Sequence, residues 1–325
     1  MVTMKYVFML VLLVLVGSMH DKFIDYDTQN EKKDHYEMVK KYLLNDSSLA
    51  RSSAPIIWIH VDPEINSRWW ASFGSRNTRC LNQPYQLLCI KSIVDKCGGN
   101  FNVCLIDDES FAKIIPGWTV DMRKIARPIL GKVRELALAR ILYYYGGMLV
   151  PSSFICFKDL TGIYKAGVYE NKMFVGEFID RNVTATNQKV FPNTRLMGCN
   201  ANCSTMKEYT SYLEQVASTD FTDESVFLGN TSRWCRNEID KNKIKLIKAE
   251  MLGAIDTDKQ LVTIERLLGS SYVDLSPDAA GIYLPEKEIL TRTAFRWFGR
   301  MNAKQVLESD TVAGKLLLVN SHPGV

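Results

Sequence analysis

The sequence lacks the strong positive charge expected of a nucleic-acid-binding domain. Its 325 residues include 40 lysines and arginines against 36 aspartates and glutamates, which gives a formal net charge of +4. Domains that bind nucleic acid usually carry more positive charge, gathered on one face. No block of like charges, low-complexity tract or internal repeat occurs. The hydrophobic content of 46% is ordinary for a globular protein, so we expect a folded domain without a nucleic-acid partner.

An apolar run long enough to cross a bilayer comfortably is also missing. The N-terminal run covers residues 6–16, whereas a spanning helix needs about 20 apolar residues. A shorter run is more typical of a signal-peptide core, and Val16 and Ser18 fit the small-residue rule for cleavage. Met19 instead extends the stretch, as in a retained anchor. We expect residues 1–19 to be a signal peptide or a signal anchor, which makes the chain secreted or membrane-anchored in the secretory pathway.

The cysteines lack the spacing of a zinc site. Cys199-x3-Cys203 has neither a second pair nor a nearby histidine, so we expect no zinc. The even count of eight is compatible with disulfides in an oxidising compartment but does not establish them. Cys89, Cys104 and Cys156 lie in apolar runs and are expected in the core. N-glycosylation sequons, which support export weakly, occur at Asn45, Asn182, Asn202 and Asn230.

Residues 20–53 have the composition of a stem. They are polar and charged, with one helical stretch expected at 36–44, and they end in Ser-Ser-Leu-Ala-Arg-Ser-Ser-Ala-Pro. Serine-rich segments that end in proline are typical of linkers. We therefore expect a single folded domain over residues 54–325.

The first part of that domain alternates strands and helices. Residues 56–61 form a short β-rich apolar run, and a helix is predicted from Pro84 to a Gly-Gly stop after Cys97. Residues 103–106 follow as a second buried strand. This order favours an α/β fold with a mainly parallel sheet flanked by helices.

The clearest helix is expected at residues 132–145, where Arg140 is the only charged residue after Leu136. Gly146-Gly147 ends it, and a third strand over 148–150 follows at once. The remaining segments are less regular. We expect strands at 154–157, 173–179 and 316–319, and helices at 206–217 and 286–298.

Polar residues directly after the predicted strands are the first functional candidates. Ligands of parallel sheets bind beyond the carboxyl ends of the strands. His60 and Asp62 end the first strand, and Asp107-Asp108 ends the second. The alternative for these aspartates is an ordinary turn or N-cap role. The third strand ends in Pro151-Ser152-Ser153.

One element carries a family resemblance. Residues 135–147 read Glu-Leu-Ala-Leu-Ala-Arg-Ile-Leu-Tyr-Tyr-Tyr-Gly-Gly and run on through a strand to Lys-Asp-Leu at 158–160. Shorter matching pieces lie at 57–59, 88–92 and 105–109. Residues 82–160 resemble the core of capsular polysaccharide synthesis proteins and of family 32-type glycosyltransferases with a DXD sugar-binding region.

The resemblance implies a GT-A-like fold that binds a nucleotide sugar and transfers the sugar to a glycan or glycoprotein acceptor. Residues 54–160 would form the nucleotide-sugar half and 161–325 the acceptor half. Glu135 stands where the family has an aspartate that reaches the nucleotide. Leu138 replaces a family arginine, for which Arg140 is a candidate substitute. The implied donor-binding set is Trp58, His60, Asp62, Glu135, Arg140, Gly147, Ser152 and Ser153.

The resemblance breaks at the triplet that should hold a metal. Pro151-Ser152-Ser153 occupies the DXD positions. A DXD carboxylate binds Mg²⁺ or Mn²⁺, which neutralises the departing diphosphate, and such hard cations prefer carboxylate oxygens. Proline offers no ligand and serine is a poor one. We therefore expect no metal at this triplet and no other cofactor.

Without a metal, cationic side chains would have to stabilise the diphosphate. A basic segment before the predicted helix offers candidates, although a solvated loop is the alternative: Arg123, Lys124, Arg127, Lys132 and Arg134. Downstream, Asp223 and Glu224 are weak candidates for the acceptor-activating base, and helix capping is their alternative role. The altered triplet keeps two functions open. One is a transferase, and the other is a catalytically inactive pseudo-enzyme that binds glycans or has a structural role.

Overall fold

A computed structural model of the chain describes residues 54–62, 83–126, 129–179, 189–219 and 229–321. The predicted targeting segment, the stem, and Asp223 and Glu224 lie outside these ranges. In the described part, no helix is both long enough and apolar enough to span a membrane. The strands are β1 (Ile56–His60), β2 (Asn102–Ile106), β3 (Gly147–Leu149), β4 (Phe154–Cys156), β5 (Met173–Ile179), β6 (Val190–Cys199), β7 (Ile244–Ile247) and β8 (Gly281–Tyr283).

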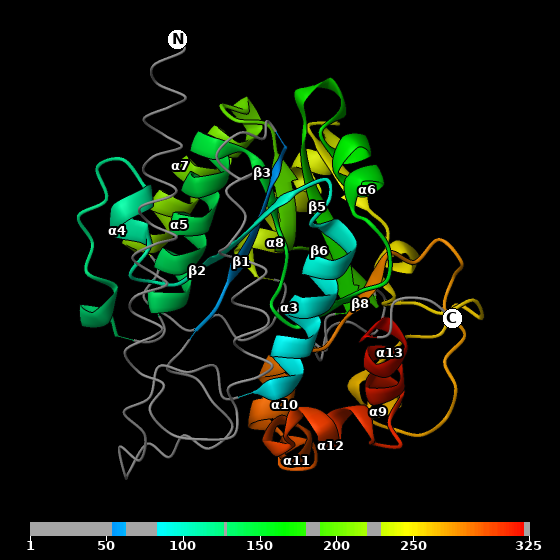
Figure 1. The fold of residues 1–325 in the computed structure, drawn as a ribbon. Helices are drawn as coiled ribbons and strands as arrows, with labels where there is room; N and C mark the ends of the chain where they lie inside the picture. Colours follow the sequence, from blue (N-terminus) through cyan, green and yellow to red (C-terminus); the bar gives the residue numbers. More distant parts are fainter. Residues whose placement is uncertain (1–53, 63–82, 127–128, 180–188, 220–228, 322–325) are drawn as a thin grey trace.

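Helices connect and cover these strands (Figure 1). The α-helices are α3 (Pro84–Cys97), α4 (Phe111–Ile114), α5 (Ile129–Tyr145), α6 (Thr161–Gly167), α7 (Ser204–Thr219), α8 (Asn230–Asp240), α9 (Ile264–Leu267), α10 (Glu286–Thr291), α11 (Arg296–Arg300), α12 (Ala303–Leu307) and α13 (Val312–Ser321). Short 3-10 turns occur at η2 (Met122–Lys124), η3 (Tyr169–Asn171) and η4 (Ala249–Leu252).

The central sheet has the strand order β2-β1-β3-β6-β5-β7. Strand β1 pairs in parallel with both β2 and β3, so the first three strands predicted from the sequence are neighbours in one sheet. Strand β6 is antiparallel to β3 and to β5, and β7 is parallel to β5. All strands of this sheet except β6 therefore run in one direction, which confirms the mainly parallel α/β prediction. Their carboxyl ends share one edge of the sheet.

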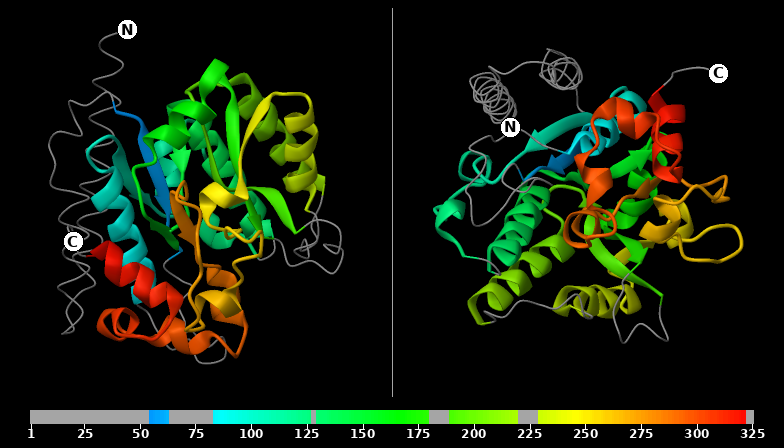
Figure 2. Two further views of the ribbon diagram at one scale, coloured as in Figure 1. Left: turned by 90° about the vertical axis from the view of Figure 1, so that its right-hand side faces the viewer. Right: turned by 90° about the horizontal axis from the view of Figure 1, so that it is seen from below.

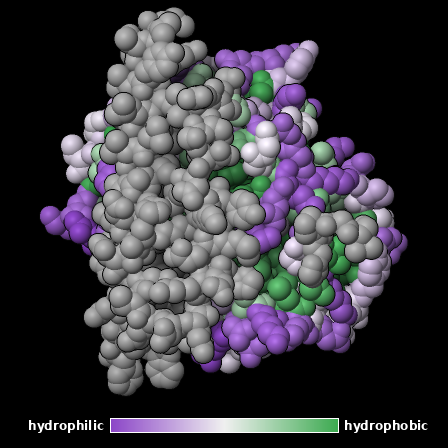
Figure 3. Space-filling model, in the orientation of Figure 1, coloured by the Kyte–Doolittle hydropathy of each residue, from purple (hydrophilic) through white to green (hydrophobic). Residues whose placement is uncertain are grey.

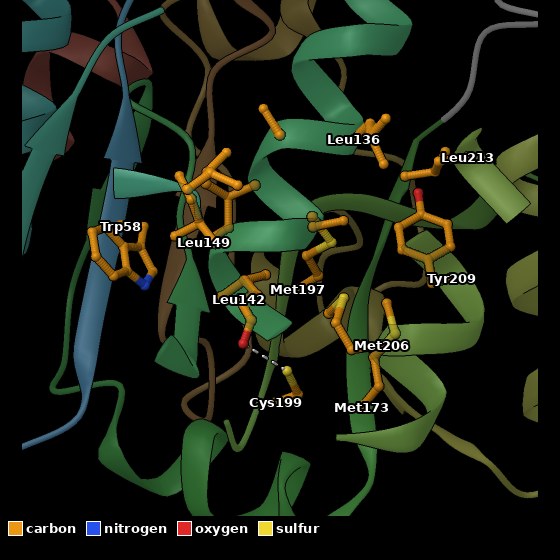
Figure 4. Packing of buried hydrophobic residues seen from close by; sticks show 14 of the residues in the cluster. Trp58, Leu136, Leu142, Leu149, Met173, Met197, Cys199, Met206, Tyr209 and Leu213 are labelled. Atoms are coloured by element: carbon orange, nitrogen blue, oxygen red, sulfur yellow. Dashed lines mark hydrogen bonds between the residues drawn. The ribbon is translucent and has the colours of Figure 1, made fainter. Parts of the chain in front are cut away.

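The alternation of side chains along β1 divides the core between the two faces of the sheet. Ile56 and Trp58 pack with α5 and α7, whereas Ile57 and Ile59 pack with the α3 side. Figure 4 shows the first of these clusters, in which Leu136 of α5 points toward Leu213 of α7. The side view and the view from below in Figure 2 show the sheet between these helix layers. Both faces are covered, as a mainly parallel sheet requires.

A second, smaller layer is built by the C-terminal part of the chain. Strand β4 pairs antiparallel with β8 in a separate two-stranded sheet. Apolar residues from α9 to α13 pack there with α3 in a cluster of their own. In Figure 3 apolar residues reach the visible surface around α13, where Leu318 and Val319 are exposed.

Two sequence predictions in this layer are wrong. Residues 316–319 were expected as a strand but lie inside α13, because tertiary packing of a short apolar run overrides its strand propensity. The helix expected over 286–298 is broken into α10 and α11 by extended backbone at Arg292. The predicted strand at 154–157 is confirmed as β4, and the helix at 206–217 is confirmed within α7.

The cysteines of the described ranges are free and buried, as expected for Cys89, Cys104 and Cys156. Burial raises the pKa of the Cys104 thiol to about 12, so this group is un-ionised near neutral pH. The Sγ atoms of Cys97 and Cys156 lie 3.8 Å apart, without a disulfide between them.

The turn from α5 into β3 explains why the sequence has two glycines there. Gly146 and Gly147 both have positive φ, at 69° and 93°. A Cβ on Gly147 would lie 2.2 Å from the backbone oxygen of Ile56, and one on Gly146 would lie 2.6 Å from the nitrogen of Ala201. Glycine is the residue that fits both the conformation and the close approach.

We expect Gly147→Ala to lower the free energy of unfolding by about 2–5 kcal/mol, because the added methyl group brings both backbone strain and overpacking. Gly131→Ala in α5 is the matched control, since a Cβ there has no neighbour within 4 Å. It should be neutral or stabilising by about 0.5–1 kcal/mol. Urea unfolding of the two variants measures the difference, and equal stabilities would contradict this account of the turn.

Candidate functional site

Two groups of polar side chains lie at the carboxyl edge of the central sheet. The first follows β1 and β2 and includes His60, Asp62 and Asp108. The second lines a cavity of about 410 Å³ formed by the end of β5, by β6, by the segment after β7, and by β8 and α10. Proteins with a parallel α/β sheet are expected to bind small ligands at this edge, in a pocket of about this size.

In the first group, Arg134 joins the ends of β1 and β2. Its Nε and Nη2 donate to Asp108 Oδ1 and Oδ2 at 2.8 and 2.5 Å, and its Nη1 lies 3.1 Å from Asp62 Oδ2. His60 Nε2 lies 2.8 Å from Asp108 Oδ1, and the imidazole stacks on Phe111. The sequence named His60 and Asp62 as candidates, but it did not identify Arg134 as the residue that joins Asp62 to Asp108, the partner of His60.

The charges in this group stabilise one another. Burial acts to raise the pKa of Asp108, but the hydrogen bonds from His60 and Arg134 outweigh burial and hold it well below its usual range. For Arg134, burial acts to lower the pKa, whereas Asp108 and Asp62 together raise it. Asp108 and Arg134 thus form an ionised pair at neutral pH. Asp107 has the ordinary turn role, since its Oδ1 accepts from the backbone nitrogen and hydroxyl of Ser110.

The triplet Pro151-Ser152-Ser153 forms the turn between β3 and β4, as a continuation of the Gly-Gly strand. Ser153 is fully buried, and its hydroxyl donates to Glu286 Oε2 at the start of α10. The Ser153 carbonyl accepts from Leu284 N at 3.0 Å, so the turn is tied to β8 and α10. The resemblance places Ser152 and Ser153 in one donor-binding set with His60, Asp62 and Glu135, and so predicts that the triplet faces these three residues. The hydroxyl of Ser153 instead contacts a carboxylate 133 residues further along the chain.

The cavity lies beside this turn. Leu284, which bonds to Ser153, is flanked by two lining residues, Tyr283 and Pro285. The apolar side chains that line the cavity are Phe178, Ile179, Leu252, Ala254, Val262, Ile264 and Pro285. The polar and aromatic side chains that line it are Asn193, Arg195, Thr263, Tyr283, Lys287, Glu288 and Arg292. An apolar wall with a few polar groups is the usual composition of a small-molecule site.

Four of the other predicted donor-binding residues have structural contacts. Trp58 is buried, and its Nε1 donates to the Gly146 carbonyl at 3.0 Å. Gly147 packs on β1, as described above. Glu135 Oε1 accepts from Thr194 and Tyr209, both at 2.6 Å, which directs this oxygen toward β6 and α7. Arg140 donates to Glu214 at 2.7 Å and lies over the Trp118 ring.

The contacts of Arg140 bear on whether it can substitute for the family arginine that Leu138 replaces. Arg140 follows Arg134 by six residues, about 9 Å along the helix axis, and so lies further from the carboxyl edge. Its contacts hold α5 against α7. Ser152 lies in the turn 151–153, beside the cavity. The donor-binding roles of Trp58, Glu135, Arg140 and Gly147 remain predictions.

The basic residues between 123 and 134 are divided between two elements, and Arg127 lies outside the described residues. Arg123 and Lys124 lie in η2, and both pair with Asp121. Lys132 and Arg134 lie inside α5, and Arg134 pairs with Asp62 and Asp108 at the ends of β1 and β2. The cations that line the cavity, Arg195, Lys287 and Arg292, were not predicted, because none lies in a basic run or directly after a parallel strand.

A search for metal ligands among the described ranges finds no group of three or more histidine, cysteine, aspartate or glutamate side chains that could hold an ion. Glu286 contacts the triplet by accepting a hydrogen bond from the Ser153 hydroxyl. One carboxylate and one serine hydroxyl do not match the oxygen set that Mg²⁺ or Mn²⁺ prefers. The residues present at the triplet therefore do not fit a DXD-type metal.

No protein-family model and no curated protein matches the chain. Among solved structures, the glycosyltransferase GlyE of Streptococcus pneumoniae TIGR4 is similar at 10% identity and a TM-score of 0.42. The match covers 83% of this chain and 64% of GlyE, less than two thirds of that protein. The galactosyltransferase LgtC, in complex with donor and acceptor sugar analogs, is similar at 12% identity and a TM-score of 0.38, over 83% of this chain and 97% of LgtC. Similarity at this level does not establish a function for this chain.

We expect Asp108→Asn to lower the free energy of unfolding at pH 7 by about 2–4 kcal/mol, because it removes the carboxylate that Arg134 and His60 share. The folded-state pKa of Asp108 is lowered, so its stabilisation is present above the unfolded pKa of about 4 and is lost as the pH falls below it. The difference in the free energy of unfolding between Asp108→Asn and the parent protein should therefore decrease as the pH falls below about 4.

Asp95→Asn is the control for this measurement, because Asp95 forms only an i,i+4 pair with Lys91 on the surface of α3. Its effect should stay below about 0.5 kcal/mol at every pH. Denaturant unfolding from pH 3 to 7 tests both variants. A pH-independent loss in Asp108→Asn would show that the ion pairs are not its cause.

Proposed function

We propose that this chain is a GT-A-like glycosyltransferase, or a close derivative that keeps the donor site. In this proposal it binds a nucleotide sugar at the carboxyl edge of the sheet and transfers the sugar to a glycan or glycoprotein acceptor. The observation that carries the proposal is the cavity beside the turn 151–153, the position at which the resembling family holds its donor. The mainly parallel sheet with helices on both faces supports it.

In such a transfer, the bond between the anomeric carbon and the diphosphate breaks, and a bond from that carbon to an acceptor oxygen forms. The acceptor hydroxyl loses its proton to a base, and the diphosphate leaves with added negative charge. The protein must therefore supply a base and a positive group. Asp223 and Glu224 remain our candidates for the base.

The positions of α7 and α8, the helices before and after Asp223 and Glu224 in the sequence, support this choice of base. Strand β6 runs opposite to the rest of its sheet, so α7, which follows it, starts at the amino edge and leads back toward the carboxyl edge. Helix α8 leads from there to β7. The described end of α7 and start of α8 therefore lie toward the carboxyl edge, and Asp223 and Glu224 fall between these helices in the sequence.

The chain would not use a metal held at the triplet. Ser153 is buried and bonded to Glu286, so a carboxylate at position 153 would face a like charge. The same observation favours the second function, a pseudo-enzyme that binds glycans or partners without transfer. The two functions share the donor cavity and differ in whether transfer is detected.

Binding of a panel of UDP- and GDP-sugars to the full-length protein, by calorimetry, tests the proposal. We expect one nucleotide class to bind with the same Kd in manganese and in chelator. Thr263→Trp, which fills the cavity, should weaken binding at least about tenfold, whereas Gln215→Trp on the exposed side of α7 should not.

Transfer with the donor that binds, followed by product analysis, separates the enzyme from the pseudo-enzyme. Absence of binding to every donor would reject both functions. Binding or transfer that requires manganese and is abolished by chelator would reject the metal-free proposal and point to another acidic pair.

A further inference from the structure

The cavity beside the turn 151–153 carries a charge imbalance. Arg195, Lys287 and Arg292 line it together with one carboxylate, Glu288, so the lining has three positive charges, one negative charge and a net charge of +2. Apolar side chains form much of the remaining wall. Charges beside an apolar wall are weakly screened, so an anion in the cavity would be strongly attracted.

The cations of the lining have different surroundings. Arg292 Nη1 lies 2.8 Å from Glu288 and 2.9 Å from Glu265, so carboxylates already surround its charge. Arg195 places its guanidinium 5.3 Å from the centre of the Tyr283 ring, on the wall of the cavity. Lys287 is exposed and makes no ion pair with any residue that the structure describes. Arg195 lies on the cavity wall and Lys287 is an exposed lining residue, so both can reach a ligand in the cavity.

A carboxylate outside the lining lies next to the cavity. Glu286 precedes Lys287 in the chain, and its Oε2 accepts from the buried hydroxyl of Ser153. The Glu286 carboxylate also interacts with the hydroxyl of Tyr283 on the cavity wall. In the cavity, Arg195 and Lys287 oppose this negative charge. Burial raises the pKa of Tyr283 despite the opposing charge of Arg195, so its hydroxyl stays protonated at neutral pH.

We propose that Arg195 and Lys287 form a diphosphate-binding site in this cavity, which takes over the charge stabilisation that a metal gives in proteins with an acidic triplet. The ligand class is the diphosphate of a nucleotide, so the inference rests on the proposed function. The guanidinium of Arg195 offers two parallel N–H groups to phosphate oxygens. Lys287 adds a mobile charge at the rim.

The site is tested with inorganic pyrophosphate and with UDP as probes, on the full-length protein in chelator. Arg195→Gln should weaken pyrophosphate binding about tenfold or more, and Lys287→Gln about threefold. The matched controls are Arg300→Gln and Lys304→Gln, two exposed cations outside the cavity lining, which should leave Kd within about twofold. Binding should also weaken steadily as salt is raised from 0.05 to about 0.5 M.

Arg195→Lys separates charge from packing, since it keeps the cation and should retain more affinity than the glutamine variant. If Arg195→Gln fails to fold, Lys287→Gln and the salt dependence decide the matter, because Lys287 is exposed. Pyrophosphate binding that neither variant nor salt affects would overturn the inference.

Two further outcomes separate this inference from the proposed function. If a nucleotide sugar binds with full affinity to both glutamine variants, the donor site stands and the diphosphate site is wrong. If pyrophosphate binds in an Arg195-dependent way but no nucleotide or nucleotide sugar binds, the diphosphate site stands and the transferase proposal is wrong.

Discussion

The close contact between Gly147 and the backbone of Ile56 sets the geometry on which the carboxyl edge depends. With a would-be Cβ only 2.2 Å from the Ile56 oxygen, this position admits no side chain, and β3 can therefore lie directly against β1. Trp58, which is also on β1, stabilises this contact by donating a hydrogen bond from its Nε1 to the Gly146 carbonyl. Helix α5 is thereby fixed across one face of the sheet, with Arg134 near its start at the ends of β1 and β2.

The same junction decides where the turn 151–153 emerges. Since β3 is only three residues long, its carboxyl end follows closely on the glycine contact. The chain then turns through residues 151–153 into β4, which pairs with β8 and so draws α10 toward the triplet. Glu286 and the cavity residues Tyr283 and Lys287 reach the carboxyl edge in this way. A local backbone requirement thus positions side chains that are more than a hundred residues away in the chain.

The charges at this edge are arranged in a way that suits an anion better than a cation. The carboxylates of Asp62 and Asp108 are engaged by Arg134, and Glu286 is engaged by Ser153. None of them is grouped with two further metal-binding side chains anywhere in the described ranges. Arg195 and Lys287, in contrast, lie in the lining of the cavity. A turn of proline and serine at residues 151–153 is compatible with our proposal that positive charge, and not a metal, stabilises the ligand at this edge.

The sequence by itself determined the alternating strands and helices of residues 56–150 and the glycine turn, because these depend on local periodicity and on backbone conformation. It also placed His60, Asp62 and the triplet at the carboxyl ends of strands, since parallel strands end at one edge. The broken helix 286–298 and the helix at 316–319 were missed, because the packing of the C-terminal layer decided them. Only the tertiary structure decided that Ser153 meets Glu286, that Arg134 joins Asp62 to Asp108, and that Arg195 lines a cavity. These pairs are far apart along the chain, and their contacts arise from strand order and helix packing, which no local pattern of residues encodes.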